Sequence, residues 1–223
     1  MQTLKKVVVV GASGFGREAL DTLEAMQAAG AEFEIQGVVD DAPSDINLER
    51  LEQRGIRYLG TIDDGLTAIG PDCAYVLGIG NPAIKQDLVS RVEAHGIHPF
   101  SAIHPTAIIG VNTSLSAGVI ICAGAVISTN VRLGEHVHVN PNATIGHDAV
   151  LDRFVSVNPG AVVSGEVRIG KHALIGASAT ILQNISVGDR TVVGAAALLT
   201  KDAPSFVVVK GIPGSWTNLG AGI

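Results

Sequence analysis

The sequence predicts an α/β domain followed by an all-β parallel solenoid, and two observations support this prediction. Over residues 1–98, short apolar runs alternate with segments of helical periodicity. From Ile103 to Leu199 an aliphatic residue recurs at every sixth position, and no insertion interrupts the series. The change of period divides the chain into a first domain, residues 1–98, and a second domain, residues 99–223, which includes a C-terminal tail.

The first domain follows the strand–turn–helix order that is typical of a doubly wound parallel sheet. Val7–Val10 is a continuous apolar run, as a strand buried on both faces requires, and a Gly-rich turn over residues 11–16 follows it. A helix comes next, with Ala19, Leu20, Leu23 and Met26 at three- and four-residue spacing. The other predicted elements are a strand over 35–39, a strand over 75–77 and a helix through Ile84, Leu88 and Val92.

The second domain has a period of six residues. Its aliphatic positions are Ile103, Ile109, Leu115, Ile121, Ile127, Leu133, Val139, Ile145, Leu151, Val157, Val163, Ile169, Ile175, Ile181, Val187, Val193 and Leu199. A helix would drift out of this frame within a few turns, so each hexad is predicted to form one short strand with its aliphatic side chain inward. A small or β-branched residue stands two positions earlier, and Gly often follows where the chain turns.

Composition and charge exclude several classes of protein. The net charge of −6 provides no basic face for phosphates, so nucleic-acid binding is not expected. No apolar run reaches the roughly 18 residues that cross a bilayer, and the first residues do not form a signal peptide. We therefore expect a cytoplasmic protein that binds no membrane. Cys73 and Cys122 are predicted to be buried free thiols.

The hexad series resembles the left-handed parallel β-helix of the hexapeptide acyltransferases. Gly11-Ala12-Ser13-Gly14-Phe15-Gly16, Asp40-Asp41 and the late Gly211-Ile212-Pro213-Gly214 extend the likeness over nearly the whole chain. With these motifs the sequence is similar to the family of sialic-acid O-acetyltransferases and nucleotide-amino-sugar N-acetyltransferases. The resemblance implies a Rossmann-like first domain, coils of three hexads each, a homotrimer, and active sites between protomers. Handedness comes from this resemblance and not from the repeat.

The Gly-rich turn and the polar residues that follow the predicted strands form a candidate ligand site. Free backbone N–H groups at a helix N-terminus favour an anion, and ligands of open α/β sheets collect at the carboxyl edge. By resemblance the ligand is a nucleotide-linked sugar, and the predicted binding residues are Gly11, Ser13, Gly14, Asp40, Asp41, Gly80 and Asn81. A tight turn without a ligand remains an alternative reading. Phe15 stands where some relatives carry His.

His147 is the predicted general base. It follows Ile145-Gly146 at a corner of the solenoid, and the residue one coil later is Gly165, which leaves room beside the imidazole. In the family, the His of such a His-Asp pair takes a proton from the sugar amine during attack on the acetyl thioester. Asp148 is predicted to orient it. Asn140 matches a family Asn near the base, although an Asn140–Asn158 ladder would also stabilise the solenoid.

The remaining candidates concern acetyl-CoA and metal. By resemblance acetyl-CoA contacts Ser156, Gly165, Ala177 and Ala195; many relatives carry His in place of Ser156, and His138, one coil earlier, is a reserve imidazole. His136, Phe154 and His172 stack in one column, with the two imidazoles roughly 10 Å apart by β spacing. This is too far to share a zinc ion, so no metal site is expected and these residues are interpreted as surface or structural. His104 is interpreted as capping the open end.

These features predict a cytoplasmic, trimeric, acetyl-CoA-dependent N-acetyltransferase. Its acceptor would be a UDP-, GDP- or dTDP-linked amino sugar used in surface glycan synthesis, and no Cys or Ser is positioned as a covalent acyl carrier. One alternative is O-acetylation of sialic acid or another sugar on the same machinery. A second alternative is a solenoid that binds a ligand without catalysis. The base and the sugar carbon that carries the amine are left open.

Overall fold

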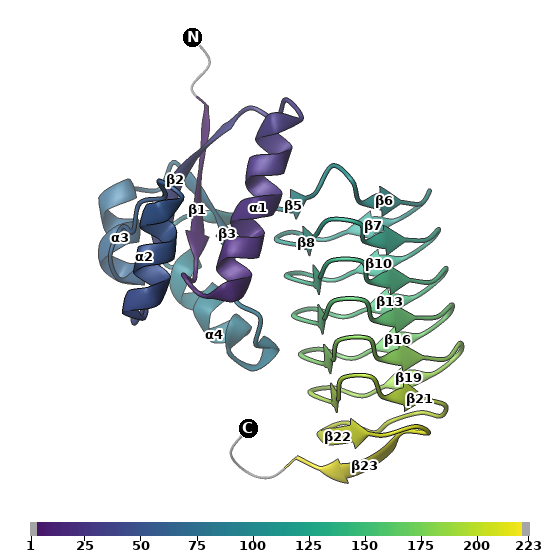
Figure 1. The fold of residues 1–223 in the computed structure, drawn as a ribbon. Coiled ribbons are helices and arrows are strands. Elements are labelled where there is room, and N and C mark those ends of the chain that lie inside the picture. Colours follow the sequence, from purple (N-terminus) through teal and green to yellow (C-terminus); the bar gives the residue numbers. More distant parts are fainter. Residues whose placement is uncertain (1–3, 220–223) are drawn as a thin grey trace.

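A computed structural model describes residues 4–219 of the chain. Figure 1 shows an α/β domain beside a stack of flat coils, with the chain entering the stack at β5 (Ala102–Ile103). At the far end an antiparallel pair of strands, β22 (Val207–Lys210) and β23 (Ser215–Asn218), closes the stack. The predicted order, an α/β domain followed by a parallel solenoid, is confirmed.

The α/β domain is built on a parallel sheet with the strand order β2-β1-β3-β4. All four valines of the run Val7–Val10 are completely buried in β1, as an interior parallel strand requires. Its elements in chain order are β1 (Lys5–Val10), α1 (Gly14–Ala28), β2 (Phe33–Val39), α2 (Asp45–Gln53), α3 (Ile62–Ile69), β3 (Cys73–Leu77), α4 (Pro82–Glu93) and β4 (His98–Pro99).

Three helices of this domain differ from the expectation. The short helices α2 and α3 were not predicted, because neither offers a long apolar stripe. The predicted face of α4 is confirmed for Val92, which is buried, and for Leu88, which packs against the core, but Ile84 is exposed. Lys85 is buried instead, because the solenoid covers that side of α4.

The solenoid consists of two-residue strands, one for each hexad. After β5 these are β6 (Ile108–Ile109), β7 (Ser114–Leu115), β8 (Ile120–Ile121), β9 (Val126–Ile127), β10 (Arg132–Leu133), β11 (His138–Val139), β12 (Thr144–Ile145), β13 (Val150–Leu151), β14 (Ser156–Val157), β15 (Val162–Val163), β16 (Arg168–Ile169), β17 (Leu174–Ile175), β18 (Thr180–Ile181), β19 (Ser186–Val187), β20 (Val192–Val193) and β21 (Leu198–Leu199). Each strand pairs in parallel with the strand 18 residues away, as His138 does with Ser156.

The strands form three sheets, which are the three sides of the solenoid. The first side contains β5, β8, β11, β14, β17 and β20, continued by β22 and β23. The second side contains β6, β9, β12, β15, β18 and β21, and the third contains β7, β10, β13, β16 and β19. Three hexads therefore make one coil, as predicted.

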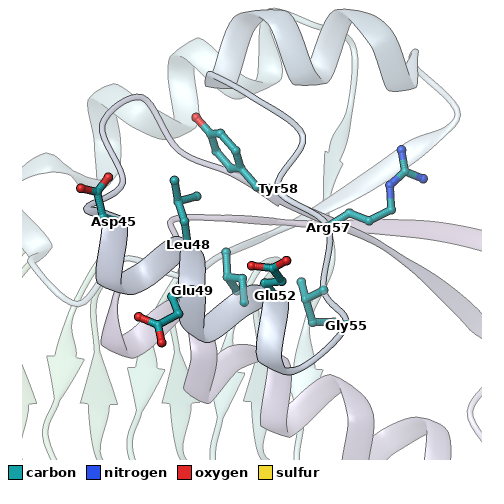
Figure 2. Close-up of a pocket in the computed structure, with 9 residues that line it drawn as sticks. Asp45, Leu48, Glu49, Glu52, Gly55, Arg57 and Tyr58 are labelled. Atoms are coloured by element: carbon teal, nitrogen blue, oxygen red, sulfur yellow. The ribbon is translucent and has the colours of Figure 1, made fainter.

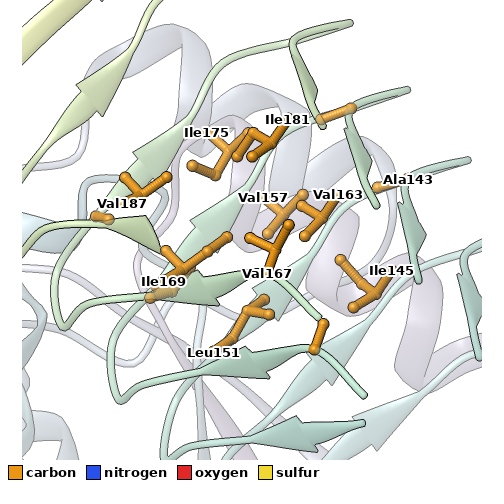
Figure 3. Close-up of a cluster of buried hydrophobic side chains, with 14 of the residues drawn as sticks. Ala143, Ile145, Leu151, Val157, Val163, Val167, Ile169, Ile175, Ile181 and Val187 are labelled. Atoms are coloured by element: carbon orange, nitrogen blue, oxygen red, sulfur yellow. The ribbon is translucent and has the colours of Figure 1, made fainter. Parts of the chain in front are cut away.

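The core of the solenoid is the predicted aliphatic column (Figure 3). From Ile121 to Leu199 every residue of the six-residue series is at most 2% exposed, and the small residues two positions earlier pack beside them. In the first coil, however, Ile109 is 37% exposed, because no coil covers it on the outer side. Burial of aliphatic side chains at this density is the main stabilising contribution to such a repeat.

Each corner contains one residue with a left-handed backbone. These residues recur at every sixth position, and they are Asn112, Gly118, Gly124, Asn130, His136, Asn142, Asp148, Phe154, Gly160, Glu166, His172, Ser178, Asn184, Arg190 and Ala196. Gly and Asn adopt this conformation at little cost, whereas most other residues are strained in it. The glycines that follow the aliphatic positions serve a different purpose: a Cβ on Gly146 would lie 2.5 Å from the backbone of the next coil.

The α/β domain covers the outer face of the first side. There the rings of His136 and His172 sandwich Phe154, with centroids 5.6 and 4.9 Å apart, and Tyr75 of β3 stacks on His136. The ammonium group of Lys85, which is fully buried, donates to the carbonyl of His136. The predicted column is confirmed, but these side chains form the domain interface rather than a surface.

Protonation of His136 is expected to weaken this interface. The Tyr75 hydroxyl donates its proton to Glu93, so the ring of His136 donates to Tyr75 through Nε2 and leaves Nδ1 without a partner. Burial, with the neighbouring charge of Lys85, lowers the pKa of His136 from 6.5 to about 4. The neutral ring of His136 therefore contributes about 3 kcal/mol to the free energy of unfolding. This contribution is complete above pH 6.5 and is lost as the pH falls toward 4.

Urea unfolding at pH 7.5, 5.5 and 4.5 measures this loss. His136→Asn, whose amide tolerates the left-handed backbone and does not titrate, is expected to flatten the pH dependence by that amount. His104→Asn is the control, because among residues 4–219 the ring of His104 forms hydrogen bonds only with its neighbour Thr106. Equal slopes for His136→Asn and the unmodified chain would show that His136 does not carry the effect.

Candidate functional site

His147 and Asp148 form an exposed pair at the edge between the second and third sides. They lie in the turn from β12 to β13, and their side chains are 57% and 46% exposed. His147 Nδ1 is 2.7 Å from Asp148 Oδ2. Asp148 has φ 58°, and this left-handed corner turns its carboxylate toward the preceding side chain, which an extended strand would not do.

The environment of Asp148 assigns the tautomer of His147. Hydrogen bonds from His147 and then from Asn130 lower the pKa of Asp148 below its usual 3.8, so the carboxylate is ionised and accepts. Nδ1 of His147 therefore carries the proton that it donates to Asp148, and Nε2 is left with a free lone pair. The pair presents a proton acceptor to solvent at the solenoid edge. Asn130 did not figure among the predicted site residues.

Gly165 makes room for the imidazole. A Cβ at this position would lie 2.5 Å from His147 Nε2 and 2.6 Å from Cε1. The stacking of Gly165 against His147 is as predicted, and the imidazole ring itself fills the room that the missing side chain leaves. The absence of a side chain at residue 165 is thus a condition for the observed position of the base.

Asn140 lies at a different edge, between the first and second sides. Its Nδ2 donates to Asn158 Oδ1 at 3.1 Å, so the predicted amide ladder exists, while its buried Oδ1 has no hydrogen-bond partner among residues 4–219. Ala177 and Ala195 lie at the same edge, in later coils. Within one protomer these three residues do not meet His147, and their roles stay predictions.

Ser156 and His138 lie on the outer face of the first side, under the α/β domain. Ser156 Oγ donates to the carbonyl of Gly80 at 3.1 Å, which joins two residues predicted for the site. The ring of His138 stacks on Phe15 at 4.7 Å and is 1% exposed, with both nitrogens unpartnered. Burial lowers the pKa of His138 well below 6.5, so this imidazole is neutral. The proposed contact of Ser156 with a thioester stays a prediction.

The Gly-rich turn is held by Asp40. Asp40 Oδ2 accepts from the amide of Ala12 at 2.8 Å, and Oδ1 accepts from the amide of Ala42. Gly11 has φ 107° and packs against the backbone of Gly78, where a Cβ would not fit. Ser13 and Gly14 are exposed at the N-terminus of α1, which has no acidic residue in its first turn. This end of the helix is open to an anion.

Asp41 and Asn81 have local structural partners. Asp41 pairs with Arg91 of α4 and accepts from the amide of Ile62, and the hydrogen bonds with Arg91 lower the pKa of Asp41 below 3.8. Asn81 Oδ1 caps α4 by accepting from Ala83 at 3.0 Å. Arg91 was not foreseen, because nothing in the local sequence links it to a carboxylate 50 residues away. Contacts of Asp41 and Asn81 with a nucleotide stay predictions.

The predicted base and the predicted ligand loop lie on opposite parts of the protomer. The α/β domain rests on the first side, whereas His147 lies at the edge shared by the two other sides. A ligand on the Gly-rich turn of one chain is thus remote from His147 of the same chain. If one reaction uses both the Gly-rich turn and His147, the two must come from different protomers.

In the part of the chain that the structure describes, no group of three or more His, Cys, Asp or Glu side chains is placed to hold a metal ion. None of the helices within residues 4–219 is both long and apolar enough to span a membrane. Figure 2 shows a surface pocket beside α2, with Leu48, Glu52 and Tyr58 among its lining residues, and it contains none of the predicted site residues.

Two family models match the chain. Residues 6–92 match the PglD N-terminal domain, and residues 166–201 match the hexapeptide repeat of succinyl-transferase. These matches agree with the α/β domain and with the coils of the solenoid, which is a left-handed parallel β-helix.

Related proteins and solved structures are also found. The chain is 29% identical over 134 residues to a GDP-perosamine N-acetyltransferase of Escherichia coli O157:H7, a match that spans 59% of this chain and 58% of that protein. The acetyltransferase domain of PglB from Neisseria gonorrhoeae, solved with acetyl coenzyme A, is 29% identical with a TM-score of 0.83, covering 96% of this chain and 99% of that one. PerB from Caulobacter crescentus, solved with CoA and GDP-perosamine, shares the fold at 24% identity and TM-score 0.78, covering 97% and 99%.

Proposed function

We propose that this chain, which matches the PglD N-terminal domain and the hexapeptide repeat, is an acetyl-CoA-dependent N-acetyltransferase of a nucleotide-linked amino sugar. The observation that carries the proposal is the exposed His147–Asp148 pair, with Nε2 free and Gly165 beneath the ring. The acetyl-CoA complex of the PglB domain, which is similar over nearly the whole chain, supports the choice of acetyl donor. GDP-perosamine N-acetyltransferase as a relative supports the acceptor class.

The chemistry follows from the tautomer of His147. The sugar amine attacks the carbonyl carbon of the thioester, the C–N bond forms and the C–S bond breaks. His147 Nε2 takes the proton that the amine must lose, and passes it to the departing CoA sulfur. Asp148 accepts from Nδ1 throughout and stabilises the imidazolium that forms between these transfers.

A homotrimer completes the site in this proposal. His147 lies at one edge, while Asn140, Ala177 and Ala195 lie at another, and the α/β domain covers the side opposite His147. Neighbouring solenoids packed side by side would place the edge with Asn140, Ala177 and Ala195 of one chain next to the His147 edge of the next chain. Acetyl-CoA would occupy the groove between them, and the acceptor would extend from the Gly-rich turn.

The α/β domain selects the acceptor. The open N-terminus of α1 and the turn held by Asp40 suit the diphosphate of a nucleotide sugar, because free N–H groups and the helix dipole favour negative charge. Acetyl-CoA and nucleotide sugars are both made in the cytoplasm, which is the compartment we assign. Surface glycan synthesis is the process that consumes such acetylated sugars.

A thiol-release assay tests the proposal. The chain is incubated with acetyl-CoA and, in separate reactions, with UDP-, GDP- and dTDP-linked amino sugars, the corresponding hydroxy sugars, and sialic acid. We expect CoA release with at least one amino sugar and none with its hydroxy counterpart. CoA release only with sialic acid or a hydroxy sugar would show that the chain is an O-acetyltransferase. No release with any acceptor would contradict the proposed enzymatic activity.

A further inference from the structure

Asp148 has a second partner besides His147. Asn130, one coil earlier at the same edge, donates from Nδ2 to Asp148 Oδ1 at 2.9 Å, while Oδ2 accepts from His147 at 2.7 Å. Each carboxylate oxygen is thereby engaged by a different side chain. A carboxylate held at both oxygens cannot rotate about its Cβ–Cγ bond without breaking one of the two hydrogen bonds.

The backbone of the two corners places the side chains of Asn130 and Asp148 next to each other. Asn130 and Asp148 both have left-handed backbones, with φ 59° and 58°, and the coils register them 18 residues apart. The amide of Asp148 also donates to the carbonyl of Thr129, so the backbone of the two corners is tied as well. Side chains that leave equivalent backbone positions in successive coils point the same way.

Within residues 4–219, the other charged side chains beside the pair form no ion pair with Asp148. A surface cleft next to Asn130 and Asp148 is lined by Arg132, Glu166 and Arg168. Among residues 4–219, His147 is the basic side chain that lies within 4.0 Å of the Asp148 carboxylate, and Arg132 and Arg168 form no such pair with it. The orientation of Asp148 therefore depends on His147 and Asn130.

We propose that Asn130 is a positioning residue of the acetyl-transfer site, which acts through Asp148 to hold the His147 ring with Nε2 free. The proposal rests on the proposed function for its catalytic consequence, but the hydrogen-bonded chain Asn130–Asp148–His147 is a feature of the fold itself. Without Asn130 the carboxylate turns more freely, and the imidazole loses both its fixed plane and its preference for a proton on Nδ1.

The test separates the amide of Asn130 from its backbone role. Asn130→Gly keeps a residue that accepts positive φ and removes only the amide. We expect kcat to fall about tenfold, with KM for both substrates within about twofold. A displaced base stabilises the transition state less well, whereas substrate binding does not depend on it. Asn112→Gly is the matched control: Asn112 has φ 56°, lies at the same edge one coil earlier, and is expected to keep full activity.

Two further measurements identify the route. In an Asp148→Gly background, Asn130→Gly is expected to have no further effect on kcat, since the amide acts through the carboxylate. Nitrogen-15 NMR of His147 needs no substrate: the Nδ1–H tautomer should dominate in the unmodified chain, and Asn130→Gly should shift the population toward Nε2–H. Asn112→Gly should leave the tautomers unchanged.

The outcomes distinguish the two proposals. If Asn130→Gly matches Asn112→Gly in kcat and in tautomer, or lowers kcat equally in the Asp148→Gly background, Asn130 is structural only and the inference is wrong. If the unmodified chain transfers no acetyl group yet the tautomer shifts as expected, the proposed function fails while the orientation of His147 by Asn130 stands.

Discussion

His147→Ala is expected to lower kcat about 10³-fold, because general bases of this kind contribute 10²- to 10⁴-fold. The imidazole is 57% exposed, and within residues 4–219 its one side-chain hydrogen bond is to the adjacent Asp148, so removing it leaves the solenoid core intact. Steady-state kinetics with acetyl-CoA and the best acceptor measures the loss. His147→Asn should behave in the same way, since an amide cannot take the proton.

Two controls belong to this substitution. Light scattering should give the same molar mass for His147→Ala as for the unmodified chain, and the thermal midpoint should agree within a few degrees. His104→Ala, at the open end of the solenoid, should keep its full rate. A rate for His147→Ala close to that of the unmodified chain would remove His147 from the role of base.

Gly165→Ala should lower kcat about 10²-fold without unfolding the protein. Gly165 does not have a left-handed backbone, so alanine is permitted by the main chain, and the obstacle is the ring of His147 at 2.5 Å from the new Cβ. The imidazole is the end of an exposed side chain and can swing away at little cost to stability. Such a displacement of about 1 Å or more is sufficient to cost two orders of magnitude in rate.

The comparison variant for Gly165→Ala is Gln183→Ala, one coil further along the same column. It removes atoms instead of adding them and should keep kcat within about twofold. Urea unfolding should place Gly165→Ala within about 1 kcal/mol of the unmodified chain. Unchanged kinetics for Gly165→Ala would mean that the ring position seen here is not the one used in catalysis.

Much of the solenoid could be predicted, because its period carries the structural information. A residue 18 positions away is the neighbour in the next coil, so the stack of His136, Phe154 and His172 and the place of Gly165 beneath His147 follow from counting. Inward and outward positions follow from the aliphatic frame. The exposure of Ile109 in the first coil did not follow, because the frame does not show where a stack begins.

The parts of the site that were missed depend on partners that no local pattern connects. The left-handed corners contain residue types as different as Asn130, Phe154 and Arg190, so their six-residue recurrence is visible only in the backbone. The histidines at the domain interface are buried by Tyr75 and α4, which lie far from them in the sequence. The contact from Asn130 to Asp148 could have been found with the same counting that placed Gly165.

The identity of the reaction product shows directly whether the chain acetylates an amine with His147 as the base. The nucleotide amino sugar that releases CoA is recovered after reaction, and its mass and its stability in mild alkali are determined. We expect a monoacetylated nucleotide sugar that resists mild alkali, as an amide does, and that is absent when His147 is replaced by Ala. An alkali-labile ester, or CoA release without an acetylated sugar, would contradict this expectation.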